Sequence, residues 1–598
     1  MAEKIRSREE IAREDTWAME DLYTSDEAWM QDLEKLKTLG AKLPEYAGKL
    51  STSAQTLLEY QKLGEEISVL LDSLANYAQR KSDEDTRNAG YQDLTGKLTK
   101  VWVQLGADTA FEVPELLSIS DEQMEKFYEE VPELNLYRRH FDSIRRKRAH
   151  VLSESEEKLL AMAGEMAGTP EEVYSLFADA DLTFRPALDA NGEEHPITQG
   201  SYIAAMESPD RTLRKNAFES LYAGFGAYKN TVAAMLSGQV KQLEFFSKAR
   251  HYTSPLEASL DATEVPVSVY HELIEAVHQN MDKMHRYMRL RKKLLGVSEL
   301  HMYDLYTPLV AASEERIPFA EAKKTVAQAL GVMGERYGKI LQEGFNNRWI
   351  DVYENTGKRS GAYSAGARVH PYVLLNYTGT LDSEFTLAHE MGHAIHSYLS
   401  NKTQPIVYSD YVIFVAEVAS TCNENLLMRY LLEGTTDKKE RAYLLNHFLE
   451  EFRTTLYRQT MFAEYELEIN RIAEGGATLT ADTLCDVYYK LNQKYYGDSM
   501  VVDKEIALEW ARIPHFYMNF YVYQYATGFS AAVALSQRIL NEGEGAVRDY
   551  LGFLSGGCTK TPIELLKGAG VDMTSPKPVD DALDLFEQLI DEFEALVK

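Results

Sequence analysis

The stretch FTLAHEMGHAIHSYLS, residues 385–400, has three histidines within eight positions and a glutamate between the first two. With its flanks it predicts one helix over 381–401, with Asp382 or Ser383 as N-cap and Asn401 as the stop. At about 100° per residue, its apolar residues form one stripe and its histidines lie nearly opposite. The stripe consists of Leu387, Met391, Ala394 and Tyr398. The histidines are therefore set apart from the apolar contact surface of this helix.

The spacing of the histidines predicts a metal site. His389 and His393 are one turn apart on the same face, so both can direct a ring nitrogen at one ion, and zinc accepts two imidazoles. Glu390 is rotated by about 100°, which suits a general base acting on water in the open coordination position. His396 is about 10.5 Å along the axis from His389, so we expect it not to be a ligand.

A third ligand is needed, and the second helical pattern SDYVIFVAEVASTCNENLLMRYLLEG, residues 409–434, offers one. Glu417 lies there among valines and alanines, where a carboxylate is costly unless it is paired or binds a metal. Glu424, two turns further on, is a candidate for a hydrogen bond that orients one of the metal ligands without itself binding the metal.

Composition narrows the classes of partner and compartment. The chain has 598 residues, 45% of them hydrophobic and 26% charged, with a formal net charge of −30. Such acidity works against binding to nucleic acid or to an anionic membrane. Three scattered cysteines, no apolar run long enough to span a bilayer and no N-terminal apolar segment predict cytoplasmic residence.

Apolar spacing predicts a mainly helical chain, as in 25–43, 56–82 and 584–598. Strand signals are local: a hairpin around Asn191-Gly192 within 182–199, and a small sheet within 347–380 beside the histidine helix. We place a domain boundary near this hairpin, with a helical lobe at 1–200 and a catalytic domain at 201–598.

HEMGH followed by FVAEVAST resembles the thimet oligopeptidase family of zinc metallopeptidases, and within it the oligoendopeptidase F subfamily. The segments GKRSGAYS (357–364), HPYVLLNY (370–377) and WAMEDLYTSDEAW (17–29) are similar to the same subfamily. The resemblance implies a two-lobed helical fold with a deep channel that admits oligopeptides. It also implies an endopeptidase with one zinc per chain, held by His389, His393 and Glu417, with Glu390 as the base.

In the segment RIPHFYMNFYVYQYATGFSAAVA, residues 512–534, Pro514 would end or start a helix. In a helix that follows it, three tyrosines share one face, at i, i+4 and i+8. They either pack in the core or donate to an oxyanion. The family has a histidine followed by tyrosines here, which implies His515 as a catalytic donor, together with Tyr521 and Tyr525. Tyr517 is assigned to substrate binding.

The strand pattern at 370–377 predicts either an internal strand or an edge strand that pairs with an extended peptide, with His370 and Tyr372 as substrate contacts in the second case. Two alternatives to the endopeptidase remain open. One is a helical zinc carboxypeptidase that binds the terminal carboxylate through Arg368 or Arg512. The other is a non-catalytic helical interaction protein.

Overall fold

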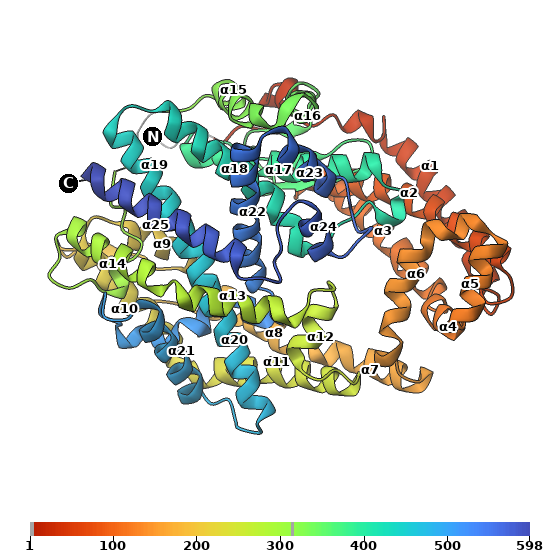
Figure 1. Ribbon diagram of the computed structural model, residues 1–598, viewed down its shortest axis with the longest axis horizontal. Coiled ribbons are helices and arrows are strands. Elements are labelled where there is room, and N and C mark those ends of the chain that lie inside the picture. Colours follow the sequence, from red (N-terminus) through yellow and green to blue (C-terminus); the bar gives the residue numbers. More distant parts are fainter. Residues whose placement is uncertain (1–4, 312–315, 598) are drawn as a thin grey trace. The chain divides into compact units, whose positions relative to one another are not determined.

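The computed structural model describes residues 5–311 and 316–597, and these are mostly helical (Figure 1). The chain forms two compact units, each drawn from three stretches of sequence. The first unit contains the described residues of 1–149, 315–430 and 535–570, and the second contains those of 150–314, 431–534 and 571–598. The prediction of a mainly helical fold is confirmed.

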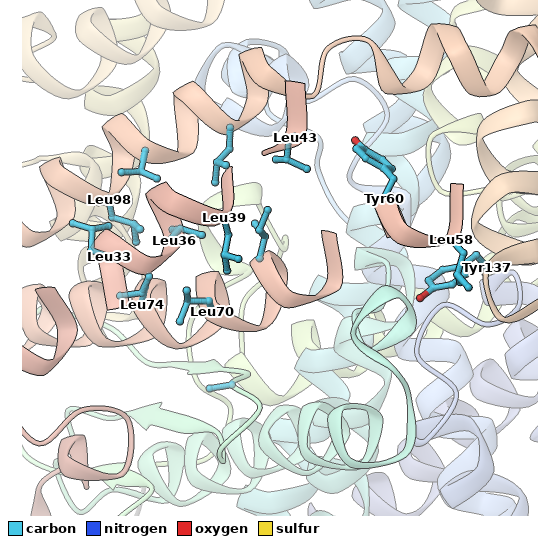
Figure 2. Close-up of a cluster of buried hydrophobic side chains, with 14 of the residues drawn as sticks. Leu33, Leu36, Leu39, Leu43, Leu58, Tyr60, Leu70, Leu74, Leu98 and Tyr137 are labelled. Atoms are coloured by element: carbon cyan, nitrogen blue, oxygen red, sulfur yellow. The ribbon is translucent and has the colours of Figure 1, made fainter. Parts of the chain in front are cut away.

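The helices of the first unit pack around a leucine-rich core. Ser25 and Ser53 cap the first two helices through their side chains, and the apolar residues that follow at three- and four-residue intervals are buried. Figure 2 shows part of this core, including Leu33, Leu36 and Leu74. The helices are α1 (Asp26–Gly40), α2 (Ala54–Glu84), α3 (Ala89–Asp108), α4 (Glu112–Ser118), α5 (Asp121–Glu130), α6 (Arg138–Arg145), α15 (Phe319–Ala329), α16 (Gly334–Asn346), α17 (Leu381–Thr403), α23 (Glu544–Leu554) and α24 (Pro562–Gly568).

The predicted small sheet is confirmed, and it packs against the histidine helix α17. It consists of β3 (Ile350–Asp351), β4 (Tyr363–Ala365) and β5 (Tyr372–Leu374), in the order β3-β5-β4. β5 is central, parallel to β3 and antiparallel to β4. The hypothesis that 370–377 supplies an edge strand is therefore wrong, because both sides of β5 are already paired. The edge next to α17 is β4.

The second unit is also helical. The predicted hairpin is present as β1 (Ala187–Leu188) and β2 (Glu194–His195), with Gly192 at φ 82° in its turn. The helices are α7 (Glu154–Ala167), α8 (Thr169–Leu176), α9 (Gln199–Glu207), α10 (Arg211–Ala227), α11 (Lys229–Ala249), α12 (Pro255–Asp261), α13 (Val267–Gln279), α14 (Met281–Leu295), α19 (Lys438–Glu451), α20 (Arg458–Glu474), α21 (Ala481–Tyr496) and α25 (Lys577–Val597).

Two further helices contain unit boundaries: α18 (Ile413–Gly434) and α22 (Tyr523–Glu542). The units do not correspond one to one with the sequence segments 1–200 and 201–598, and that division stays a prediction, as does the channel. Among the described residues, no helix combines the length and apolarity that crossing a membrane requires.

Candidate metal centre

The helix that carries the histidines is held by its apolar side. Leu387, Met391 and Ala394 are fully buried, as the predicted stripe requires. The N-cap differs from the prediction: Thr380 holds that position, and its hydroxyl accepts the N–H of Ser383 at 3.2 Å. Helix α17 therefore begins at Leu381, one residue before Asp382.

The backbones of α17 and α18 touch at Gly392. A Cβ on this glycine would lie 2.6 Å from the carbonyl oxygen of Ala419, which is too close for any side chain. Asn423 adds a link, because its amide donates to the Ala388 carbonyl at 3.0 Å while its oxygen accepts the Tyr337 hydroxyl at 2.7 Å. Sequence reasoning missed both residues, although a glycine between the two histidines was a signal for close helix contact.

This contact brings the three predicted ligands together. His389, His393 and Glu417 each offer a ligand atom, and these atoms all lie within 4.8 Å of one another. Glu417 Oε2 is 3.4 Å from Nε2 of His389 and 3.5 Å from Nε2 of His393. Two imidazole nitrogens and one carboxylate oxygen are the donor types of a catalytic zinc site, so these residues fit such an ion.

The electrostatics of Glu417 match this role. Burial alone would raise the pKa of its carboxyl, but hydrogen bonds from His389 and His393 outweigh burial and hold that pKa well below its ordinary range. The Ser420 hydroxyl donates to Glu417 Oε2 at 3.2 Å, one turn along α18. The carboxylate is therefore ionised and oriented toward the two rings.

Glu390 is a neighbouring carboxyl with one unpartnered oxygen. It is 6% exposed, and its Oε2 atom is buried without a hydrogen-bond partner among the described residues. Burial raises the pKa of the Glu390 carboxyl, and this effect outweighs the opposing charges of His389 and His393. A buried unpartnered carboxyl oxygen beside three metal-type donors is unusual, and it points to a partner that binds there.

Glu424 lies beside the ligand cluster and His396 lies outside it, as predicted. Glu424 Oε2 lies 3.2 Å from Nδ1 of His389, on the side of the ring away from Glu417. His396 is not part of the cluster: it is 1% exposed and stacks on Tyr411 at 3.7 Å between ring centroids. Burial lowers the pKa of His396 to about 3, so it is a neutral core residue.

The tyrosine segment belongs to the second unit, and its helix begins later than predicted. Pro514–Tyr517 forms a 3-10 turn, the chain then leaves helical geometry, and α22 begins at Tyr523. Asn519 and Phe520 have φ of 50° and 62°, and this left-handed conformation ends a right-handed helix. The three tyrosines therefore do not share one helix face.

His515, Tyr521 and Tyr525 nevertheless come together. The Tyr525 hydroxyl lies 3.5 Å from Nε2 of His515, and the Tyr521 and Tyr525 rings meet edge to face at 5.3 Å. Burial lowers the pKa of His515, assisted by the charge of Arg458. A neutral imidazole next to two phenols is a set of hydrogen-bond donors and acceptors.

Three residues predicted to contact substrate lie elsewhere. Tyr517 is 3% exposed and stacks on Tyr174 at 4.5 Å. Tyr372 is fully buried on the central strand, and its hydroxyl donates to the Ala18 carbonyl. His370, 6% exposed, lies against Trp349 and faces Asp21 at 3.2 Å. Packing explains all three positions, and a contact between these residues and substrate stays a prediction.

Comparison with known families and proteins fits this geometry. The family model described as Peptidase family M3 matches residues 204–585, and a second model, Oligopeptidase F, matches 115–184. The chain belongs to peptidase family M3. The predicted family resemblance and the prediction of a metalloendopeptidase are confirmed.

The relatives agree over nearly the whole chain. Oligopeptidase PepF of Bacillus subtilis is 48% identical over 597 residues, covering 100% of this chain and 89% of its own. The chromosomal oligoendopeptidase F of Lactococcus lactis subsp. cremoris is 42% identical and covers 99% of both chains. The crystal structure of oligoendopeptidase-F from Enterococcus faecium superposes with a TM-score of 0.75 at 38% identity, covering 96% of this chain and 99% of its own.

Proposed function

We propose that this metallopeptidase is a zinc-dependent endopeptidase that hydrolyses internal bonds of oligopeptides, with Glu390 as general base. The observation that carries the proposal is the convergence of His389, His393 and Glu417 beside the unpartnered carboxyl oxygen of Glu390. The relatives named as oligopeptidases and oligoendopeptidases support the substrate class.

Each residue of the site has a separate role in this proposal. His389, His393 and Glu417 would hold one zinc ion, which when bound acts as a Lewis acid toward a carbonyl and lowers the pKa of water. Glu390 takes a proton from the attacking water and returns it to the leaving amine. One carboxyl serves both transfers, because the base that accepts the proton is the acid that returns it. Glu424 orients the ring of His389.

Two further groups have roles in this proposal. His515, with Tyr521 or Tyr525, would donate hydrogen bonds to the developing oxyanion. The edge strand β4 would pair with the backbone of an extended peptide, which replaces the role first given to 370–377. The side-chain oxygen of Ser364 on this strand is buried without a hydrogen-bond partner among the described residues.

The alternatives receive less support. Membership in a peptidase family argues against a non-catalytic interaction protein. For a carboxypeptidase, Arg512 is already engaged over the ring of Tyr202 at 4.9 Å. A peptide blocked at both ends separates the two enzyme classes, because only an endopeptidase cleaves it.

The mechanism is tested with Glu390→Gln. The amide keeps the shape of the side chain but cannot accept the proton, so turnover should fall by about 10⁴-fold or more while one metal ion per chain is retained. Metal content is measured by elemental analysis of the same preparation. Turnover near the wild-type rate in the metal-loaded variant would rule out Glu390 as the base.

A further inference from the structure

Residues 517–520 form a turn between His515 and Tyr521, and the backbone of this turn is strained. Asn519 and Phe520 are consecutive residues in the left-handed region, with φ of 50° and 62°. Neither is glycine, so each conformation costs free energy that contacts with the surroundings must offset. Two buried polar side chains from neighbouring helices of the second unit make such contacts.

Gln239 on α11 holds the first half of the turn. Its side chain is 5% exposed, and its amide nitrogen donates to the Tyr517 carbonyl at 2.8 Å and to Asn519 Oδ1 at 2.9 Å. A side-chain amide has two N–H groups, so both are used on residues of the turn. Because the two acceptors belong to residues on either side of Met518, the amide fixes the path of the chain between them.

Glu466 on α20 holds the second half of the turn. It is 2% exposed, and its Oε1 accepts the buried N–H of Phe520 at 3.0 Å. Phe520 lies outside any helix or strand, so Glu466 supplies the acceptor that secondary structure would otherwise provide. The ring of Phe520 also meets the ring of Tyr270 edge to face at 5.7 Å. Both the N–H and the ring of Phe520 are therefore anchored in the core of the second unit.

The residues on the two sides of the turn are the proposed hydrogen-bond donors. The rings of His515 and Tyr521 are partly exposed and nearly parallel, with 6.2 Å between their centroids. We propose that Gln239 and Glu466 are positioning residues for peptide hydrolysis, because they fix the turn that joins these two rings. The inference rests on the proposed role of His515 and its tyrosine partners at the oxyanion. A displacement of about 1 Å in such a group can cost about 100-fold in rate.

The first test measures hydrolysis of a peptide blocked at both ends by the full chain loaded with zinc. Gln239→Leu replaces the amide with an apolar group of similar size, so kcat should fall by about 10- to 100-fold while KM changes by less than about threefold. Gln242→Leu is the matched control, one turn further along α11. The side chain of Gln242 is partly exposed and makes no hydrogen bond to the turn in the part of the chain that the structure describes, so kcat should persist.

Glu466 is tested with a pair of variants. Glu466→Leu removes the acceptor for the Phe520 N–H, so kcat should fall as in Gln239→Leu. Glu466→Gln keeps an acceptor of the same shape and should restore kcat to within about threefold of the wild type. Equal losses in both variants of Glu466 would contradict its part in the inference.

A background without the two donors separates positioning from a general defect in folding. In a protein with His515→Ala and Tyr521→Phe, the further change Gln239→Leu should lower kcat by no more than about threefold, because the groups it positions are gone. A loss as large as in the wild type would overturn the inference. An unchanged kcat in the His515→Ala, Tyr521→Phe protein itself would instead contradict the proposed oxyanion role of these two residues.

The position of His515 can also be measured without catalysis. In protein labelled with a carbon isotope at histidine Cε1, the NMR signal of His515 is the one that disappears in His515→Ala. This signal should shift in Gln239→Leu and in Glu466→Leu and stay in place in Gln242→Leu, while the signals of the other histidines report that the chain is folded. An unmoved His515 signal in both folded leucine variants would overturn the inference whatever the kinetic result.

Discussion

Glu424 contacts the imidazole ring of His389 at the nitrogen that does not face Glu417. Its carboxylate lies 3.2 Å from Nδ1 of His389, while Nε2 of the same ring faces Glu417. A hydrogen bond at Nδ1 fixes both the tautomer and the ring orientation of a metal-binding histidine. Glu424→Gln should therefore weaken zinc binding by about 10- to 100-fold, measured by competition with a chromophoric chelator. An unchanged affinity would show that the carboxylate is dispensable.

Glu466 in the second unit gives a pH prediction. Burial raises its pKa to about 8, and its Oε1 accepts the Phe520 N–H at 3.0 Å. Above the ordinary pKa of about 4.3 the unfolded chain releases this proton, while the folded chain keeps it until about pH 8. The free energy of unfolding should thus fall between about pH 5 and pH 8, by roughly 2–4 kcal/mol from this group.

Glu466→Gln isolates that contribution. The amide keeps the acceptor for Phe520 and has no proton to lose, so the variant should gain stability relative to the wild type as the pH rises. Urea unfolding at pH 5 and pH 8 measures the difference between the two proteins. A difference that does not change with pH would contradict a protonated carboxyl.

At the residue scale, sequence predicts which side chains lie close together where helix geometry alone fixes the distance. The spacing of His389 and His393 is one turn in any helix, and an acid among valines and alanines indicated Glu417. Prediction failed at 517–525, because Asn519 and Phe520 adopt left-handed φ without being glycine. Such a conformation is imposed by surroundings like the buried Glu466, which local sequence does not reveal.

At the scale of elements, Gly392 sets the distance between α17 and α18. Gly392→Ala should cost about 1–3 kcal/mol of stability, because the new methyl group meets backbone rather than a movable side chain. It should also weaken zinc binding, since Glu417 is carried away with α18. Denaturant unfolding and chelator competition measure the two effects.

Gly338 is the matched control on α16. A Cβ there meets no atom within 4 Å, so Gly338→Ala should stabilise the protein by about 0.5–1 kcal/mol and leave zinc affinity unchanged. Comparable losses in both variants would indicate a general effect of alanine on helices rather than contact between α17 and α18.

The order of the strands in the small sheet could not be predicted from the sequence. A small sheet within 347–380 could be predicted from β-branched and aromatic residues between glycines. Which strand is central depends on parallel pairing between β3 and β5, whose partners are far apart in the chain. The hypothesis of an edge at 370–377 failed for that reason, because the edge strands are β3 and β4.

At the scale of the whole molecule, metal binding should stabilise the chain through the first unit, which holds all three ligand residues. Zinc at about 100 times its Kd should add about 2.7 kcal/mol to the stability of that unit. Calorimetric scans with zinc and with a chelator should show a shift in Tm for the wild type and none for His393→Ala. A shift of equal size in the variant would place the bound ion elsewhere.

Sequence predicted the helical class and the small sheet, but it did not predict the composition of the units. Periodicity is local, whereas each unit gathers three separated stretches through long-range packing. A boundary sought as one point along the chain cannot describe such an arrangement.

The interleaving of the two units has a consequence for biosynthesis. Residues 535–570 belong to the first unit, although its first stretch leaves the ribosome hundreds of residues earlier. The histidine helix is made long before its last neighbours: the ring of His396, for example, packs against Phe553. Packing of the first unit cannot be complete before residues 535–570 have been synthesised, so the nascent chain depends on surroundings that tolerate exposed apolar helices.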